Sequence, residues 1–218
     1  MEFVRDGMVL GLGTGSTARH VIEVLAERIR SGELRDIVGV PTSRATEHHA
    51  RQLGIPLTTL DQEPRLDLAI DGADEVDPHL DLIKGLGGAL LWEKIVATAS
   101  EQLLIVVDSG KLVDRLGRVS PVPVEVVPFG WTTHLAYIDL LGARATLRQS
   151  ADGEPFRTDS GNYILDCAFD NGLVDATRIE REFRHRVGIV ESGLFLGMAD
   201  VVVVGDAGGV RVLHAEGM

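Results

Sequence analysis

The sequence is poor in cysteine and in aromatic residues, and it contains no long hydrophobic run. Its 218 residues include one cysteine, Cys167, so no disulfide can form within the chain and a reducing compartment is the simplest environment. Cys167 lies in the apolar run 163–169, which favours a buried thiol over a reactive nucleophile. No run reaches about 18 apolar residues, and no basic region followed by an apolar run marks a secretory signal. We therefore expect a cytoplasmic protein with no membrane partner.

Positive charge is also scarce. The formal net charge is −12 at pH 7, and no basic patch interleaved with aromatic residues occurs. Nucleic-acid binding relies on basic surface that displaces counterions, so this composition argues against a nucleic-acid partner. Among the 21 basic residues only Lys84, Lys94 and Lys111 are lysines. Because lysine is a compact point charge that can titrate, this clustering indicates a role for Lys84; the alternative is a chance cluster in an arginine-biased composition.

The first half of the chain alternates hydrophobic strands with amphipathic helices. Strands are predicted at residues 8–12, 37–40, 66–70 and 103–108. Helices are predicted at residues 16–30, 43–53 and 90–100. This order indicates a parallel sheet flanked by helices, as in a Rossmann-like α/β fold.

The pattern changes after Pro121. Prolines bracket residues 122–127, which we interpret as a connector or an edge strand. A helix, a strand and a second helix are predicted at 133–141, 162–168 and 176–186, and a strand at 201–204 could return to the first sheet. We expect a Rossmann-like domain of residues 1–128 plus 199–218, and a smaller α+β domain of residues 129–198.

The first of two glycine-rich turns follows the first strand and holds Thr14, Gly15, Ser16 and Thr17. A dinucleotide fingerprint would need glycine at position 16 and a P-loop would need a nearby lysine, and the chain has neither. Hydroxyl groups, backbone N–H groups and the N-terminus of the next helix together suit a phosphate. The alternative is a tight turn in which Ser16 only caps the helix.

Acidic residues precede the second glycine-rich turn, 84–88. Asp71 and Asp74 follow a predicted strand, at the kind of strand end where open α/β sheets bind ligands. They could serve catalysis or sugar binding, or they could cap and solvate a turn. A third alternative is a Mg²⁺ site formed by Asp74 with Glu75 and Asp77.

Glu93 lies near the start of a predicted helix, among apolar neighbours. Partial burial would raise its pKa toward neutrality, which suits a carboxylate that takes and returns a proton. The alternative is a surface ion pair of Glu93 with Lys94. The residues alone leave both open.

Taken together, several motifs resemble type A ribose-5-phosphate isomerase. They occur in that family's order over essentially the whole chain, which makes them far more specific than a lone glycine loop. They are Gly11–Thr17, Asp71–Glu75, Lys84–Ala89, Glu93–Ile95, Asp108–Lys111, Pro121–Val126 and Gly193–Phe195. The resemblance implies an aldose–ketose isomerase that interconverts D-ribose 5-phosphate and D-ribulose 5-phosphate in the pentose phosphate pathway, with no metal and no cofactor.

The same resemblance implies roles for single residues. Glu93 matches the base that carries a proton between C1 and C2, and Lys84 matches the lysine that stabilises the enediolate oxygen. Asp71 and Asp74 match the carboxylates that hold sugar hydroxyls, with Asp71 a candidate for ring opening. The other substrate-binding matches are Thr14, Gly15, Ser16, Thr17, Gly72, Ala73, Gly85, Leu86, Gly87 and Lys111. The resemblance also implies a homodimer or homotetramer. It implies that the Rossmann-like domain of residues 1–128 plus 199–218 is the catalytic domain, and that the smaller α+β (ferredoxin-like) domain of residues 129–198 carries the oligomer contacts.

One departure and two rival hypotheses remain. The resemblance implies an N-terminal helix with a ligand-site lysine before the first strand, whereas this chain starts almost at that strand. We expect a start codon placed too far downstream; the alternative is a short form that does without the helix and its lysine. A sugar-phosphate-binding sensor would lack catalysis and would need a DNA-reading segment. An enzyme similar to the CoA transferases would use Glu93 as a nucleophile rather than as a base.

Overall fold

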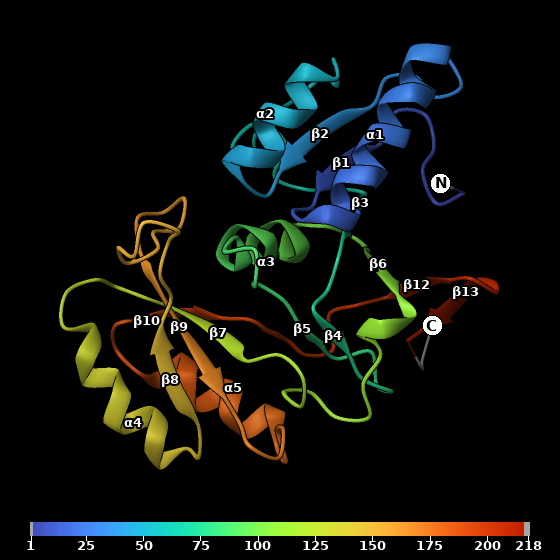
Figure 1. Ribbon diagram of the computed structural model, residues 1–218. Helices are drawn as coiled ribbons and strands as arrows, with labels where there is room; N and C mark the ends of the chain where they lie inside the picture. Colours follow the sequence, from blue (N-terminus) through green and yellow to red (C-terminus); the bar gives the residue numbers. More distant parts are fainter. Residues whose placement is uncertain (1, 216–218) are drawn as a thin grey trace. The chain divides into compact units, whose positions relative to one another are not determined.

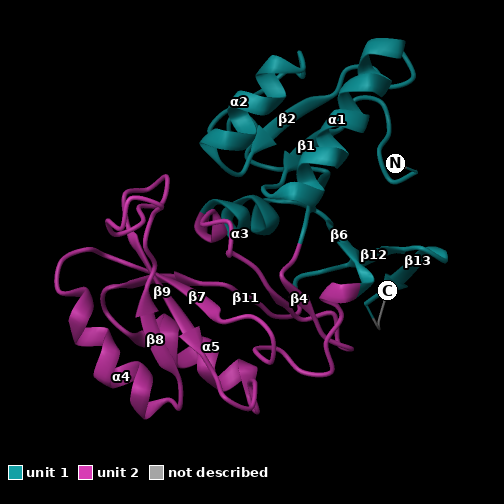
Figure 2. Cartoon of the chain, viewed as in Figure 1, with its two compact units in different colours: residues 1–72, 92–109, 198–218 teal, residues 73–91, 110–197 magenta. Residues whose placement is uncertain are grey.

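The chain forms two compact units in the computed structural model, which describes residues 2–215 (Figure 2). Unit 1 contains residues 1–72, 92–109 and 198–218, and unit 2 contains residues 73–91 and 110–197. The division into domains 1–128 with 199–218 and 129–198 stays a prediction. Residues 1 and 216–218 of that first domain lie outside the described part of the chain.

Unit 1 is built on a six-stranded sheet with the order β13-β12-β6-β3-β1-β2 (Figure 1). Its strands are β1 (Val9–Leu12), β2 (Val38–Pro41), β3 (Leu68–Asp71), β6 (Leu103–Asp108), β12 (Val201–Asp206) and β13 (Gly209–His214). All neighbours pair in parallel except β12 and β13, which form an antiparallel hairpin. The parallel sheet predicted from the sequence is confirmed, and the predicted strand at 201–204 does return to it.

Three helices accompany this sheet: α1 (Ser16–Ser31), α2 (Arg44–Gln52) and α3 (Leu90–Ala99), the last of which begins in unit 2. Successive residues of a strand point to opposite faces. Leu10 and Leu12 of β1 join Ile22 and Leu25 of α1 in one core cluster, so α1 covers that face. Gly11 points to the other face, where a Cβ atom would lie 2.5 Å from Cγ1 of Val96. Glycine therefore allows α3 to pack closely on β1.

Unit 2 contains a four-stranded antiparallel sheet with the order β10-β7-β9-β8. Its elements in chain order are β7 (Val122–Val126), the short helix η2 (Trp131–His134), α4 (Leu135–Leu140), β8 (Arg144–Leu147), β9 (Tyr163–Ala168), α5 (Ala176–His185) and β10 (Ile189–Ser192). Without the short helix this is the β-α-β-β-α-β succession of ferredoxin-like folds. The expected α/β fold with a smaller ferredoxin-like part is confirmed.

Strand β7 corrects the expectation that residues 122–127 form a connector or an edge strand. It lies between β10 and β9 in the interior of the sheet, and all its residues are buried. Pro123 is tolerated there because its carbonyl accepts a hydrogen bond from Gly193 N–H, at 2.7 Å. The N and O atoms of one strand residue face the same neighbour. The missing N–H of Pro123 is therefore directed beyond the end of β10, and the β9 ladder loses no bond.

A small three-stranded sheet completes unit 2. It has the order β11-β5-β4 and consists of β4 (Glu75–Val76), β5 (Leu82–Ile83) and β11 (Leu194–Phe195). Strands of two residues are too short to show a periodic pattern, and the sequence predicted none of them. The sheet holds the segments that carry Asp74 and Lys84.

Cys167 lies on β9 and is completely buried, which confirms the prediction of a core thiol. Burial raises the pKa of this thiol far above its ordinary range, so the thiolate is strongly disfavoured. None of the helices within residues 2–215 has the length and apolar character needed to cross a membrane.

Candidate active site

The turn between β1 and α1 is held by a cluster of hydroxyl groups. Thr14 Oγ1 lies 2.8 Å from Thr42 Oγ1, 2.8 Å from Ser43 Oγ and 3.1 Å from Thr46 Oγ1. Two of these residues also hold the backbone, because Thr42 Oγ1 donates to Leu12 O and Thr46 Oγ1 donates to Gly13 O. The turn is thus fixed by the segment that follows β2.

The sequence did not single out Thr42, Ser43 and Thr46. A local signal for them exists, because Ser43 caps α2 by accepting a hydrogen bond from Thr46 N–H at 3.0 Å. That spacing is typical of a helix start. It indicates a cap, however, and does not indicate that the cap also contacts Thr14.

Asp71 fastens the same turn from the end of β3. The residue is 4% exposed, and its Oδ1 accepts hydrogen bonds from Thr14 N–H at 3.1 Å and from Gly72 N–H at 2.8 Å. A Cβ atom on Gly13 would lie 2.2 Å from Asp71 Oδ1 and 2.7 Å from Asp71 Cα. Gly13 is therefore required for the close approach of the turn to β3.

The N-terminus of α1 is open toward an anion. Its N-cap is Gly15, which adopts φ 110°, and no side chain caps the helix. The alternative in which Ser16 only caps α1 is therefore wrong, because Ser16 is the first helical residue. Gly15 and Ser16 are exposed and Thr17 is half-buried. N–H groups and the helix dipole at such an N-terminus favour phosphate.

These residues lie where physical reasoning expects a ligand. The parallel strands follow the order β2-β1-β3-β6-β12, so the chain reverses its direction across the sheet between β1 and β3. Doubly wound sheets bind ligands outside the carboxyl ends of the strands on either side of this reversal. Thr14 follows the end of β1 and Asp71 ends β3.

Glu93 lies in the first turn of α3 and is 5% exposed. Lys94 is equally buried, so the alternative of a surface ion pair is wrong. A buried carboxyl group at the start of a helix is available for proton transfer with little competition from solvent.

Unit 2 supplies the other predicted site residues, on the segments around β4 and β5. Asp74 is half-buried; its N–H donates to Ile83 O, and its Oδ2 accepts a hydrogen bond from Leu86 N–H at 2.9 Å. Lys84 is 2% exposed, and its Nζ lies 5.4 Å from the ring centroid of Phe195. An aromatic face stabilises a cation in this position.

The structure distributes the predicted residues between the two units. Unit 1 contains Thr14, Gly15, Ser16, Thr17, Asp71, Gly72 and Glu93. Unit 2 contains Ala73, Asp74, Lys84, Gly85, Leu86, Gly87 and Lys111. Lys111 is half-buried at the end of the short helix η1 (Ser109–Lys111), and Leu86 and Gly87 are exposed. Within unit 1 a hydrogen bond joins Thr14 with Asp71, and within unit 2 a hydrogen bond joins Asp74 with Leu86.

Glu75 has a structural role, which argues against the Mg²⁺ alternative. Its side chain is completely buried, and its carboxylate accepts hydrogen bonds from the N–H groups of Gly117, Val119 and Ser120. Those donors occupy the oxygen atoms that a metal would need. Within residues 2–215 no group of three acidic, histidine or cysteine side chains is arranged to hold a metal.

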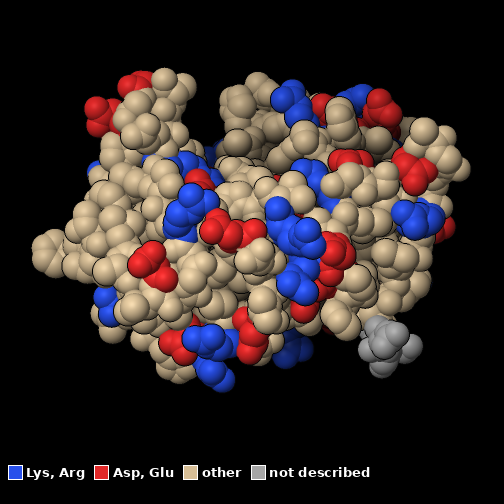
Figure 3. All heavy atoms as spheres, turned by 60° about the horizontal axis from the view of Figure 1, so that its bottom comes forward, with Lys and Arg blue, Asp and Glu red and all other residues tan. Residues whose placement is uncertain are grey.

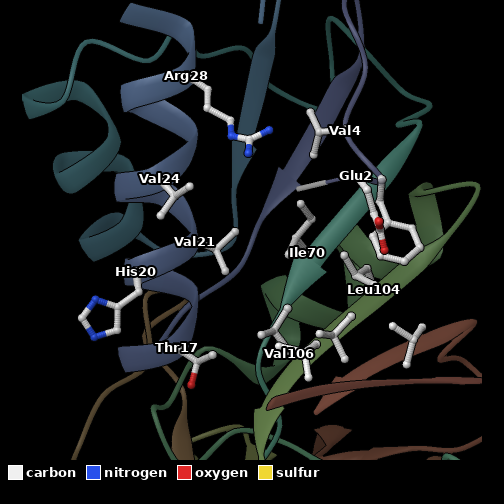
Figure 4. A pocket seen from close by; sticks show the side chains of 14 residues that line it. Glu2, Val4, Thr17, His20, Val21, Val24, Arg28, Ile70, Leu104 and Val106 are labelled. Atoms are coloured by element: carbon white, nitrogen blue, oxygen red, sulfur yellow. The ribbon is translucent and has the colours of Figure 1, made fainter. Parts of the chain in front are cut away.

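A cavity of about 550 Å³ opens beside α1 in unit 1 (Figure 4). Val21 and Val24 of α1 point into it opposite Ile70 and Val106 of the sheet, and Thr17 lies at one end. Its lining is mainly aliphatic and includes neither Asp71 nor Glu93. Such a lining does not suit a charged small molecule, and Thr17 is the candidate site residue that the lining includes.

Charges of both signs lie close together on one face of the molecule. On the face drawn in Figure 3, Lys and Arg are interspersed with Asp and Glu. With a formal net charge of −12, the binding of an anion would depend on local positive groups.

The sequence matches the family model of ribose 5-phosphate isomerase A (phosphoriboisomerase A) over residues 38–209. It is 54% identical to the ribose-5-phosphate isomerase A of Gloeobacter violaceus, over 98% of this chain and 91% of that protein. It is 50% identical to a probable chloroplastic ribose-5-phosphate isomerase 3 of Arabidopsis thaliana, over 98% of this chain and 79% of that protein.

Two solved structures have the same fold. One is a D-ribose-5-phosphate isomerase in complex with phospho-erythronic acid, with a TM-score of 0.95, 42% identity, and coverage of 98% of this chain and 93% of that one. The other is the ribose 5-phosphate isomerase of Plasmodium falciparum, with a TM-score of 0.95, 40% identity, and coverage of 99% and 94%.

Proposed function

The chain belongs to the ribose 5-phosphate isomerase A family, and we propose that it interconverts D-ribose 5-phosphate and D-ribulose 5-phosphate with Glu93 as the base. The observation that carries the proposal is the arrangement at the carboxyl ends of β1 and β3. There an uncapped helix N-terminus and a buried carboxylate, Asp71, flank one glycine turn. An anion site beside a carboxylate suits a phosphorylated sugar.

The reaction moves a hydrogen between two neighbouring carbon atoms. Glu93 removes the proton from C2 of the open-chain aldose, and the electrons of that bond form an enediolate. The same carboxyl group then returns the proton to C1 while the proton of the C2 hydroxyl passes to the oxygen on C1, which gives the ketose. One carboxylate serves both half-reactions because the two carbons are adjacent.

The other residues bind and polarise the substrate. Lys84 stabilises the negative charge that develops on the enediolate oxygen, as a fixed cation can. Asp71 and Asp74 accept hydrogen bonds from sugar hydroxyls, and Asp71 assists the opening of the ring. The remaining substrate contacts are Thr14, Gly15, Ser16, Thr17, Gly72, Ala73, Gly85, Leu86, Gly87 and Lys111. No metal or organic cofactor takes part in this scheme.

Location and assembly complete the proposal. The single, buried Cys167 suits a reducing compartment, and we place the enzyme in the cytoplasm as part of the pentose phosphate pathway. We expect a homodimer or homotetramer, without nucleic-acid or membrane partners. A sensor without catalysis is not favoured, because the relatives bear the names of isomerases.

The test measures the turnover of ribose 5-phosphate in EDTA by the purified chain and by its Glu93→Gln variant. The substitution removes the base and should lower kcat by about 100-fold or more, because general base catalysis contributes about that much. Glu101→Gln, an exposed glutamate just after α3, is the matched control and should turn over normally. Undiminished turnover by Glu93→Gln would contradict the assigned base, and an inactive parent chain would contradict the proposed activity.

A further inference from the structure

Arg148, just after β8, contacts the second glycine turn from a distant part of the sequence. Its Nη1 donates to Gly85 O at 2.9 Å and to Leu86 O at 3.0 Å. Its Nε donates to Asp166 Oδ2 at 2.9 Å, and its Nη2 donates to the other oxygen of Asp166. All these residues belong to unit 2. One guanidinium group thus ties a carboxylate of β9 to two consecutive carbonyls of the turn.

The pair is built rigidly. The side chains of Arg148 and Asp166 are 13% and 24% exposed, and their forked geometry has two parallel hydrogen bonds. Such bidentate pairs are the strongest charge-assisted hydrogen bonds in proteins. The guanidinium also lies 5.8 Å from the ring centroid of Phe156, and that ring fills the space where Gly88 would carry a Cβ atom.

This contact determines which polar groups the turn presents. In a trans peptide the C=O and N–H groups point in opposite directions. The Gly85–Leu86 peptide has its oxygen on Arg148 and its N–H on Asp74 Oδ2. The next peptide also has its oxygen on Arg148, so the N–H of Gly87 points away from the guanidinium.

We propose that Arg148 is a positioning residue for substrate binding, a role that rests on the proposed function. It draws the carbonyl oxygens of residues 85 and 86 away from the bound phosphosugar. An anionic ligand is repelled by carbonyl oxygens and attracted by N–H groups, so a turn with the opposite orientation would bind it poorly. The same contact fixes Asp74 through the N–H of Leu86, and Asp166 acts only through Arg148.

The first measurement is the dissociation constant of phospho-erythronic acid for the wild type and for Arg148→Met. We expect binding to weaken by about 30-fold and kcat/KM to fall in parallel, because a buried hydrogen-bonded charge is removed. Arg157→Met is the matched control. Arg157 also stacks on an aromatic ring, that of Tyr163, and also donates to a backbone carbonyl, that of Gly161, and neither partner belongs to the turn.

A second readout does not depend on activity. Hydrogen exchange followed by mass spectrometry should be faster over residues 84–88 in Arg148→Met than in the wild type and in Arg157→Met, because the turn loses its anchor. Arg148→Lys should give an intermediate result, since an ammonium group reaches fewer acceptors than the guanidinium fork. If Arg148→Met does not fold, Asp166→Asn replaces it in both measurements, because asparagine keeps the shape of aspartate and removes the charge that pairs with Arg148.

The outcomes separate the positioning role from the proposed function. A folded Arg148→Met protein with unchanged exchange and unchanged affinity for phospho-erythronic acid would overturn the role of Arg148. So would a loss no larger than that of Arg157→Met. If the wild type does not turn over ribose 5-phosphate, the proposed function fails, yet faster exchange confined to 84–88 would still support the anchor. The double variant Arg148→Met/Asp166→Asn should be no worse than Arg148→Met alone.

Discussion

The two glycine turns of the molecule are held in opposite ways. At the first turn, neutral hydroxyl groups hold the carbonyl oxygens of Leu12 and Gly13, and the carboxylate of Asp71 holds the N–H group of Thr14. In the second turn, residues 84–88, a guanidinium group holds the carbonyl oxygens of Gly85 and Leu86. The first turn is held by short contacts around the ends of β1, β2 and β3, while the second depends on Arg148 and Asp166, far along the chain.

The two turns also differ in the kind of group that holds them. The first turn rests on close steric fit and on a hydroxyl cluster without charge, beside the buried carboxylate of Asp71. The second turn is held by the guanidinium group of Arg148, which is paired with Asp166. Buried charges occur in both units: Asp71, Glu93 and Lys94 in unit 1, and Glu75, Lys84 and Glu125 in unit 2. We therefore expect steric changes to be most damaging in the first turn, and changes of charge to be most damaging where a buried carboxylate holds several donors.

Gly13→Ala should produce the largest effect, and it tests whether the first turn depends on steric fit. Its Cβ atom would collide with Asp71, including the backbone Cα at 2.7 Å, so the turn must move away from β3. We expect a loss of about 3 kcal/mol in the free energy of unfolding and a fall in kcat/KM. Gly205→Ala on β12 is the control, because its Cβ would meet nothing nearer than 4.0 Å. Urea unfolding of both variants measures the contrast; equal stabilities would refute the steric argument.

Glu75→Gln tests the charged side of the comparison. The carboxylate accepts three backbone N–H groups, whereas an amide offers one oxygen and places an NH₂ group against a donor. We expect a loss of about 2 kcal/mol in the free energy of unfolding. The exposed Glu154→Gln should leave stability unchanged. If the two variants unfold at the same denaturant concentration, the buried carboxylate does not anchor residues 117–120.

Thr14→Val sharpens the comparison within the first turn. The substitution keeps the shape of the side chain and removes the hydroxyl that three other hydroxyls contact. We expect a loss of about 1 kcal/mol in the free energy of unfolding, with little dependence on salt because no charge is involved. Thr14→Ser retains the hydroxyl and should lose less. Thermal unfolding at low and high salt provides the measurement, and a strong salt effect would contradict the neutral character of the cluster.

Glu125→Gln should have the smallest effect, and the effect should depend on pH. Burial raises the pKa of Glu125, and the negative charges of Glu191 and Asp159 raise it further, while hydrogen bonds from Asn162 and Thr158 oppose the shift. The folded state then holds the proton more tightly than the unfolded state. Stability therefore falls as the pH rises from the ordinary carboxyl pKa through the raised value.

The glutamine variant removes this titration. Its free energy of unfolding should stay level over the window in which the wild type loses stability, and the two should converge at acid pH, where Glu125 is protonated. Urea unfolding at a series of pH values gives both profiles. Glu154→Gln should follow the wild type, and parallel profiles for the wild type and Glu125→Gln would refute the assignment.

Sequence patterns predicted what depends on neighbours along the chain. The periodicity of β1 and α1 could be read directly, as could Asp71 at a strand end. The position of β7 could not be predicted from Pro123, because the outcome depends on which neighbour its missing N–H would face. The contact of Arg148 and Asp166 with the second turn could not be predicted either, because both residues are distant from that turn in the sequence. Likewise, a cap at Ser43 does not indicate that Thr14 lies against it.

Cys167 can report how often unit 2 opens. It is the single cysteine of the chain, it lies in the core of unit 2, and unit 1 has no thiol. A thiol reagent added to the native protein can therefore react only after the sheet of unit 2 opens. The rate of labelling measures that opening without any engineered probe. A bound ligand that stabilises unit 2 would lower this rate.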